Sequence, residues 1–361
     1  MKSIQYILIF CVAILAGSSC ADEIIAPHSS IPPAFGKVNE LTVLSDQNMW
    51  EGAVGDTLDF YYTGAFPITP TPEPMLDLRH FNNYQITKST VFKHYRSYVI
   101  LANLADAESP ITQMVKKDIG EENYRKAMKD PNFNSIVGKN KWAKGQILIY
   151  LFAPTESQLI DVIKEKLPDV VERVYEHDLK QIEANTYGGG EHVIAQNTIF
   201  EMMQVDSRIP KEFVIAKKSI SENMIWLRKD VRDESIENIV IKSIPYTSEK
   251  QFETDSIIAM INDFGAKHIV ENEIKVNNRD LPTYEFTRTI DTRYMKEIRG
   301  IWESTQKFMG GPYIAYLIKD DENENLIFAM SFIFAPGEQK RNLIQQDDMI
   351  IRQLAGSKSL N

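Results

Sequence analysis

The stretch Ile-Tyr-Leu-Phe-Ala-Pro-Thr-Glu at residues 149–156 recurs near the other end of the chain as Ser-Phe-Ile-Phe-Ala-Pro-Gly-Glu at residues 331–338. Each copy is an apolar run that ends in Phe-Ala-Pro and leads into a pattern typical of an amphipathic helix. Proline cannot continue a sheet ladder and suits the first turn of a helix. Two such units predict two α+β domains. Duplication of one domain and coincidence in a common strand-to-helix turn both explain the repetition.

The segments around these two runs predict the rest of the fold. In the first half, apolar runs predict strands at residues 40–44, 75–81, 97–104 and 146–152, and a long apolar stripe predicts a helix from Thr155 to about Tyr187. In the second half, eight runs predict strands, many of which alternate apolar with polar residues as half-buried antiparallel strands do. The predicted fold class is two α+β domains with mainly antiparallel sheets and packed amphipathic helices. The eight runs are residues 213–216, 224–228, 239–244, 268–274, 282–289, 294–303, 313–319 and 326–334.

The N-terminus predicts that the protein is exported from the cytoplasm. One positive charge at Lys2 precedes an apolar run at residues 6–15 and four small residues at 16–19, which is the order of a secretory signal. The run is shorter than the roughly 20 apolar residues that span a bilayer. Cys20 follows directly and resembles the lipobox cysteine of bacterial lipoproteins, which is acylated and becomes the first mature residue. Gly17 stands where that pattern most often has Leu, and a plain cleaved signal with an incidental cysteine is the alternative.

A proline-rich segment then separates Cys20 from the folded body. It contains Pro27, Pro32, Pro33 and Gly36 with few large apolar residues, and it predicts an extended tether. The expected division of the chain is a lipoprotein signal peptide at residues 1–19, a tether at 20–37, an N-terminal α+β domain at 38–205 and a C-terminal α+β domain at 206–361.

Composition excludes several classes of protein. The 361 residues carry a formal net charge of −10 and show no cluster of Lys and Arg with interleaved aromatics, so nucleic acid is not an expected partner. The two cysteines, Cys11 and Cys20, are accounted for by the signal and the lipid, so the mature body has no disulfide, catalytic thiol or cysteine metal ligand.

Catalytic and metal-binding motifs are absent from the sequence. It contains no Gly-x-Ser-x-Gly elbow and no His-Glu-x-x-His pair, and Gly188-Gly189-Gly190 lacks the ending of a phosphate loop. The acidic stretch at residues 320–325 offers oxygen ligands to calcium, but it lies between two predicted strands and lacks the pattern of an EF-hand, which favours a solvated hairpin turn. No catalytic residue, metal site or cofactor is therefore predicted.

Two stretches combine tryptophan with glycine and suggest a recognition surface. Trp50 lies near Gly52, Gly55 and Asp56, while Trp302 lies near Arg299, Gly310, Gly311 and Tyr313. An aromatic face beside exposed backbone amides can hold a sugar, a peptide or another protein. Core packing with tight turns is the competing interpretation. The candidate recognition residues are Trp50, Asp56, Arg299, Trp302 and Tyr313.

The motifs, taken together, resemble an uncharacterised family of lipoproteins from Bacteroidetes, domain of unknown function 4837. The resemblance runs from about Lys37 to the C-terminus, and Gly145 stands where the family pattern has Pro. It implies lipidation and a cell-envelope location, and it carries no assigned catalytic or binding residue. The motifs are Trp50-Glu51-Gly52 with Gly55-Asp56, Pro72-Glu73-Pro74 with Asp77, Lys141-Trp142-Ala143-Lys144, Arg299-Gly300-Ile301-Trp302, Phe308-Met309-Gly310-Gly311-Pro312 and Phe334-Ala335-Pro336.

These observations predict a lipid-anchored protein of the cell envelope, held at the outer membrane and facing the periplasm or the cell surface. Its expected partners are the membrane, through the N-terminal lipid, and an envelope protein, peptide or glycan. The leading expectation is a non-enzymatic binding or interaction protein. The alternative is an envelope hydrolase whose carboxylate or serine residues meet only in the fold.

Overall fold

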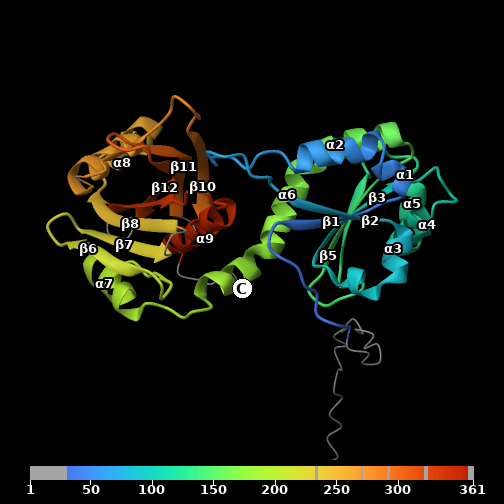
Figure 1. The fold of residues 1–361 in the computed structure, drawn as a ribbon, viewed down its shortest axis with the longest axis horizontal. Coiled ribbons are helices and arrows are strands. Elements are labelled where there is room, and N and C mark those ends of the chain that lie inside the picture. The colour runs from blue at the N-terminus through green and yellow to red at the C-terminus, as the bar shows by residue number, and fades with distance from the viewer. Residues whose placement is uncertain (1–30, 232–234, 270, 291–292, 321–323, 357–361) are drawn as a thin grey trace, which may run out of the picture.

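The computed structural model describes residues 31–231, 235–269, 271–290, 293–320 and 324–356. These residues form two α+β units, each built on its own sheet (Figure 1), and the predicted fold class is thereby confirmed. The predicted signal peptide, Cys20 and the tether up to residue 30 lie outside the described residues. No helix among the described residues has the length and apolar character needed to cross a membrane.

The N-terminal unit contains a five-stranded sheet in the order β2-β1-β3-β5-β4. Strands β1, β2, β3 and β5 are parallel, and only β4 is antiparallel to its neighbour, so this sheet departs from the antiparallel expectation. The physical reason is burial on both faces, which makes β3 and β5 continuous apolar runs. The strands are β1 (Glu40–Leu44), β2 (Asp77–Phe81), β3 (Ser97–Asn103), β4 (Ser135–Lys139) and β5 (Ile147–Ala153).

Helices cover both faces of this sheet. One core packs the sheet against α1 (Gln47–Trp50), α2 (Ala53–Tyr62) and α6 (Glu156–Tyr187). The opposite core packs it against the remaining helices of the unit. Those are α3 (Asn83–Lys88), η1 (Thr90–His94), α4 (Pro110–Ile119) and α5 (Glu121–Ala127).

Gly55 explains why residues 47–62 form two helices rather than one. A Cβ atom on Gly55 would lie 1.8 Å from the carbonyl oxygen of Trp50, so only glycine permits α2 to approach the end of α1 this closely. Close backbone approach, rather than a ligand, therefore accounts for this glycine.

The C-terminal unit contains an antiparallel sheet of eight strands, in which the order is β10-β11-β12-β13-β8-β7-β6 and β9 pairs with β11. The strands are β6 (Val214–Ser219), β7 (Met224–Val231), β8 (Ser235–Pro245), β9 (Ile274–Val276), β10 (Tyr284–Ile290), β11 (Arg293–Ser304), β12 (Gly310–Asp320) and β13 (Asn325–Phe334). The acidic stretch links β12 to β13, where Asp320 pairs with Asn325; residues 321–323 lie outside the described residues.

Helices lie on both faces of the second sheet as well. Its helices are α7 (Val193–Met203), η2 (Glu249–Phe252), α8 (Thr254–His268), α9 (Arg341–Arg352) and η3 (Gln353–Ala355). One core contains residues of α7 and α9, and the other contains residues of α8. Ala195, Ile199 and Met203 of α7 are buried in the second unit, so packing divides the units before Val193 rather than at the expected position after residue 205. The two sheets differ in topology, so the repeated strand-to-helix stretch is a local similarity and not a duplicated domain.

The described end of the predicted tether is paired with the N-terminal unit. The amide of Ala34 donates to the carbonyl oxygen of Lys144 at 2.8 Å, and the amide of Phe35 donates to that of His94 at 2.9 Å. Residues 33–36 are therefore held against the unit, because their backbone groups find partners there, and an extended tether up to residue 37 is not observed.

Candidate functional site: a pocket between the two units

A proline-rich arm, residues 66–74, crosses from the first unit to the second between α2 and β2 (Figure 1). Prolines at four of its nine positions keep it from joining either sheet. Ile68 of this proline arm is 3% exposed within the core of the second unit and has a φ of 73°. A β-branched residue rarely adopts that conformation, so burial of its side chain holds the backbone there.

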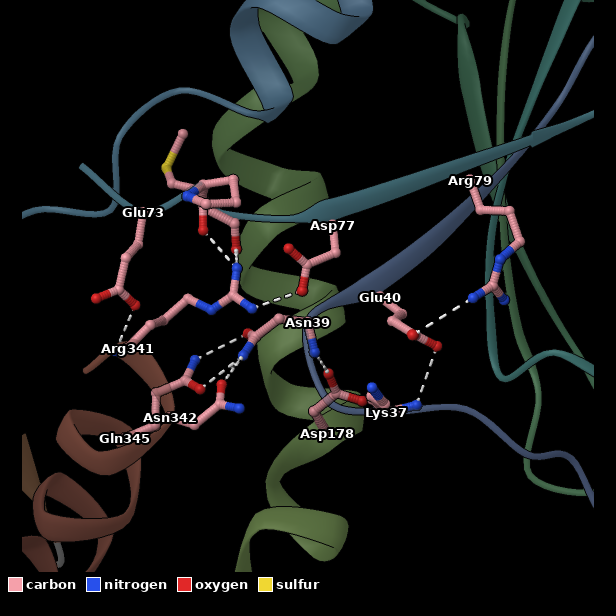
Figure 2. A network of polar contacts seen from close by, with 12 residues as sticks. Lys37, Asn39, Glu40, Glu73, Asp77, Arg79, Asp178, Arg341, Asn342 and Gln345 are labelled. Carbon is pink, nitrogen blue, oxygen red and sulfur yellow. Dashed lines mark hydrogen bonds and ion pairs between the residues drawn. The ribbon is translucent and has the colours of Figure 1, made fainter. Parts of the chain in front are cut away.

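Glu73 of the proline arm caps helix α9 of the other unit. Its carboxylate accepts hydrogen bonds from the amides of Lys340, at 2.7 Å, and Arg341, at 2.9 Å. The guanidinium of Arg341 in turn donates to the carbonyl oxygen of Pro74 and, at 2.6 Å, to the carboxylate of Asp77 (Figure 2). A carboxylate at a helix N-terminus satisfies unpaired amides and complements the helix dipole. The first unit thus supplies a cap that α9 lacks in its own segment.

Amide side chains join the units beside this cap. Asn39 and Gln345 exchange two hydrogen bonds, of 2.8 and 2.9 Å, and Asn39 also donates to Asn342 at 3.0 Å (Figure 2). The backbone amide of Asn39 donates to Asp178 of α6 at 2.6 Å, and Arg96 pairs with the other oxygen of Asp178 at 3.0 Å. Burial raises the pKa of Asp178 to about 6, although the Asn39 amide and Arg96 act against it.

A pocket of about 290 Å³ lies next to this junction and is lined by both units. Its apolar walls are formed by Phe66, Pro67, Met75 and Leu76 on one side, and by Val171 and Tyr175 of α6. Tyr284, Phe286 and Arg288 of the edge strand β10 line it from the second unit, because alternate residues of a strand share one face. The volume is close to the lower end of known ligand pockets, about 300 Å³.

The charged side of the pocket is built from β10, β11 and α9. Asp348 binds Arg299 at 3.1 Å and Arg352 at 3.0 Å, and it accepts a hydrogen bond from the hydroxyl of Tyr316. Gln345, Asp348 and Arg352 come from one face of α9. They therefore present one amide, one carboxylate and one guanidinium to the same pocket.

Glu297, on the same strand face as Arg299, completes this charged cluster. It is fully buried and pairs with Arg299, with Arg288 at 2.6 Å and with Arg352 at 3.7 Å. Three guanidinium groups therefore meet two carboxylates, those of Glu297 and Asp348, which leaves one uncompensated positive charge beside the pocket.

The adjacent aspartates Asp347 and Asp348 have opposite electrostatic environments. Burial disfavours ionisation of Asp348, but Arg299, Arg352 and the Tyr316 hydroxyl outweigh it and lower its pKa below the ordinary value. Burial raises the pKa of Asp347 well above the ordinary value, and the nearby Glu237 adds to this shift. Asp347 accepts a hydrogen bond of 2.5 Å from Ser331 and does not line the pocket. Of this acidic pair, only Asp348 belongs to the site.

The structure does not bring the five predicted recognition residues together. Arg299 lines the pocket. Trp302 is 3% exposed and Tyr313 is 1% exposed, and both lie in the core between the second sheet and α8. They are core residues because their rings fill that layer, and Trp302 also donates to the carbonyl oxygen of Ile333 at 3.2 Å. The expectation that these two residues form a surface is therefore corrected.

Trp50 and Asp56 lie in the first unit, away from this pocket. Trp50 is half-buried and stacks on His80, with ring centroids 4.5 Å apart and planes 3° apart. Asp56 is exposed in the first turn of α2, where its charge complements the helix dipole. Neither residue lines the pocket between the units.

Sequence reasoning missed the other charged residues of the site. A usable signal is that Glu297 and Arg299 lie between the apolar Met295 and Ile301 on one face of β11, since charges on the inner face of a strand need partners. Asp348 and Arg352 carry the same signal at helical spacing. The role of Glu73 left no such signal, because its partners are backbone amides 267 and 268 positions away.

A second polar cluster lies at the carboxyl ends of the parallel strands. The Ser45 hydroxyl is 3.0 Å from Nε2 of His80, and Asp46 accepts a hydrogen bond of 2.5 Å from Ser109. Ser45 is fully buried, and burial lowers the pKa of His80 to about 4. Within the described ranges, no group of three or more His, Cys, Asp or Glu side chains is arranged to hold a metal ion.

Comparisons with known proteins cover both units. Residues 192–353 match the family model described as Domain of unknown function (DUF4837), which confirms the resemblance for the second unit. Residues 34–187 match a different model, also described as Domain of unknown function (DUF8532). No curated protein matches the chain.

Similarities to solved structures are weak, as two of them illustrate. Cyanobacterial PsbP (CyanoP) from Synechocystis sp. PCC 6803 is 10% identical, with a TM-score of 0.30, over 41% of this chain and 83% of that one. The Ran-binding protein Mog1p of Saccharomyces cerevisiae is 10% identical, with a TM-score of 0.27, over 42% of this chain and 91% of that one.

Proposed function

We propose that this chain is a lipid-anchored cell-envelope protein that binds a small molecule, or one end of a larger partner, in the pocket between its two units. The pocket is the observation that carries the binding role, because apolar walls with a few convergent polar groups are typical of ligand sites. The signal-like N-terminus and Cys20 support the location, at the outer membrane facing the periplasm or the cell surface.

Binding fits the chemistry of the pocket better than hydrolysis does. A carboxyl group that acts as a general acid needs a raised pKa, whereas the pKa of Asp348 is lowered by its arginines and Tyr316 against the effect of burial. Glu297 is fully buried and engaged by three arginines. Ser45 and His80 are within hydrogen-bonding distance, but a fully buried hydroxyl offers no access to a substrate. We therefore propose a non-enzymatic role.

The anchoring is tested by Cys20→Ala. We expect the mature body to move from the membrane fraction to the soluble fraction, because the acyl chains supply the affinity, at about 0.8 kcal/mol per buried methylene. Thermal unfolding should be unchanged, because a proline-rich segment separates Cys20 from the folded body in the sequence. The measurement is fractionation after a salt wash, with the far-ultraviolet circular dichroism of both forms as the control. Retention of the variant on membranes would contradict the anchor.

The binding role is tested by what co-purifies with the protein. Phe286 forms a pocket wall and is 42% exposed, so Phe286→Ala removes apolar contact without opening the core. We expect the small molecules that are extracted from the intact lipoprotein to fall about tenfold in this variant, which corresponds to about 1.4 kcal/mol of lost binding. Phe60→Ala, at a site on α2 that is 74% exposed and outside the pocket, is the matched control. Equal extracts from all three proteins, compared by mass spectrometry, would refute pocket binding.

A further inference from the structure

The aromatic and cationic groups of the pocket face one another across a short distance. The guanidinium carbon of Arg288 lies 5.5 Å from the centre of the Phe286 ring, and that of Arg299 lies 6.0 Å from it. Phe286 and Arg288, which both belong to β10, are partly exposed, so a ligand can reach them. A ligand in this corner would therefore touch an aromatic surface and a cation at once.

Arg288 has unused hydrogen-bonding capacity. Its Nε donates to Glu297 at 2.6 Å, and no hydrogen bond to another described residue engages its two terminal nitrogens. The side chain is 38% exposed, whereas the Arg299 side chain is 15% exposed and engaged by two carboxylates. A guanidinium edge with two free nitrogens matches the two oxygens of a carboxylate, a phosphate or a sulfonate.

The charge balance of the cluster favours the same class of ligand. Glu297 and Asp348 neutralise two of the three arginines, and the remaining charge lies beside a pocket whose walls are mainly apolar. A neutral ligand would leave that charge partly desolvated, and a cationic ligand would add to it. An anion would pair with it while an apolar body occupied the space beside Phe66, Val171 and Tyr175.

We propose that the pocket between the units selects a small amphipathic anion, with its acidic headgroup on Arg288 and its apolar body against Phe286, Phe66 and Val171. This inference rests on the proposed binding function and adds the chemical class of the ligand. Carboxylate and phosphate headgroups share the required chemistry. The volume of about 290 Å³ suits a molecule with one short apolar body.

The test uses the full chain in its soluble Cys20→Ala form and four probes. Binding of 8-anilinonaphthalene-1-sulfonate is followed by fluorescence, and decanoate, decyl phosphate, decanol and decyltrimethylammonium are used to displace it. We expect both anions to displace the dye at least about tenfold more effectively than decanol, and the cation to be the weakest. Comparison of the two anions shows which headgroup is preferred.

Arg288→Gln should remove the preference for anions. Arg228→Gln is the matched control, because Arg228 is 39% exposed and its Nε binds Asp230 at 2.8 Å, outside the pocket. We expect Arg288→Gln to weaken the binding of decanoate at least about tenfold and to leave the binding of decanol unchanged. Arg228→Gln should alter the binding of neither probe. Matching thermal unfolding of the three proteins excludes a folding defect.

Two results would overturn the anion assignment. If decanol displaces the dye as effectively as decanoate does, and Phe286→Ala weakens the binding of both probes, the pocket binds apolar molecules without selecting charge. If no probe displaces the dye, or if Arg288→Gln binds the probes as Arg228→Gln does, Arg288 does not bind an acidic headgroup. In either case the broader binding function is still judged separately by the molecules that co-purify with the unmodified lipoprotein.

Discussion

Asp348→Asn is expected to destabilise the protein by about 3–5 kcal/mol, the range seen when one partner of a buried ion pair is removed. The Asp348 side chain is 3% exposed and forms ion pairs with Arg299 and Arg352. An amide of the same size keeps the packing but leaves both guanidinium groups with less compensating charge. Urea denaturation at pH 7 measures the loss as a shift of the midpoint at an unchanged slope.

Asp347→Asn is the matched control for this prediction, because the two residues are adjacent on α9. Asp347 is fully buried with a raised pKa, so ionising it opposes folding at neutral pH. We expect its replacement by Asn to leave stability unchanged or to increase it. Equal destabilisation by the two substitutions would contradict the different charge states assigned to these neighbours.

The pH dependence of the two variants should differ in sign. For Asp347, whose folded pKa is raised, the stabilising contribution is complete below the unfolded value of about 3.9 and is lost as the pH rises towards the folded value. For Asp348, whose folded pKa is lowered, the contribution is present above the unfolded value and is lost as the pH falls towards the folded value. Urea denaturation from pH 3 to pH 8 measures this. In each variant, the stability should lack the pH-dependent contribution of the aspartate that was replaced.

Trp302→Ala is expected to cost about 3–5 kcal/mol, because it deletes a large buried ring and leaves a cavity. The ring packs near Phe332 and Phe334, with centroids 6.0 and 6.5 Å away, and its indole nitrogen satisfies the carbonyl oxygen of Ile333. Gly311 permits this packing, since a Cβ there would lie 1.9 Å from the same carbonyl oxygen. The tryptophan and the glycine are therefore parts of one close-packed layer.

Trp50→Ala provides the comparison. Trp50 is half-buried and stacks on His80 at the margin of the first core, so we expect a loss of stability well below that of Trp302→Ala. Thermal unfolding of both variants gives the measurement. A melting temperature of Trp302→Ala equal to that of the unsubstituted protein would refute its core position.

The strands of the second unit could be predicted closely from the sequence. Expected strands at residues 294–303, 313–319 and 326–334 correspond to β11, β12 and β13, because apolar residues recur along each of these runs and turn residues separate them. The expected strand at residues 268–274 is wrong, since α8 extends to His268 and β9 begins at Ile274. There the helical pattern ends in apolar residues that resemble a strand when read alone.

The parallel order of the first sheet and the pocket itself could not be predicted in this way. Parallel strands pair with partners that are distant in sequence, and a continuous apolar run does not reveal its direction. The pocket depends on contacts such as Asn39 with Gln345, which are 306 positions apart. Arg299 is the single predicted recognition residue that lines this pocket. It was predicted from its closeness to Trp302 and the glycines, whereas ion pairs with Glu297 and Asp348 hold it at the pocket.

The cap that Glu73 provides to α9 links the pocket to the order of protein synthesis. The ribosome makes α9 after every strand of both sheets, so Asp348 and Arg352 are the last residues of the pocket to exist. The cap closes a loop of 267 residues, at an entropic cost that grows only slowly with length. A prematurely terminated chain could thus form both sheets, yet it would lack the charged face of α9 and could not assemble the site.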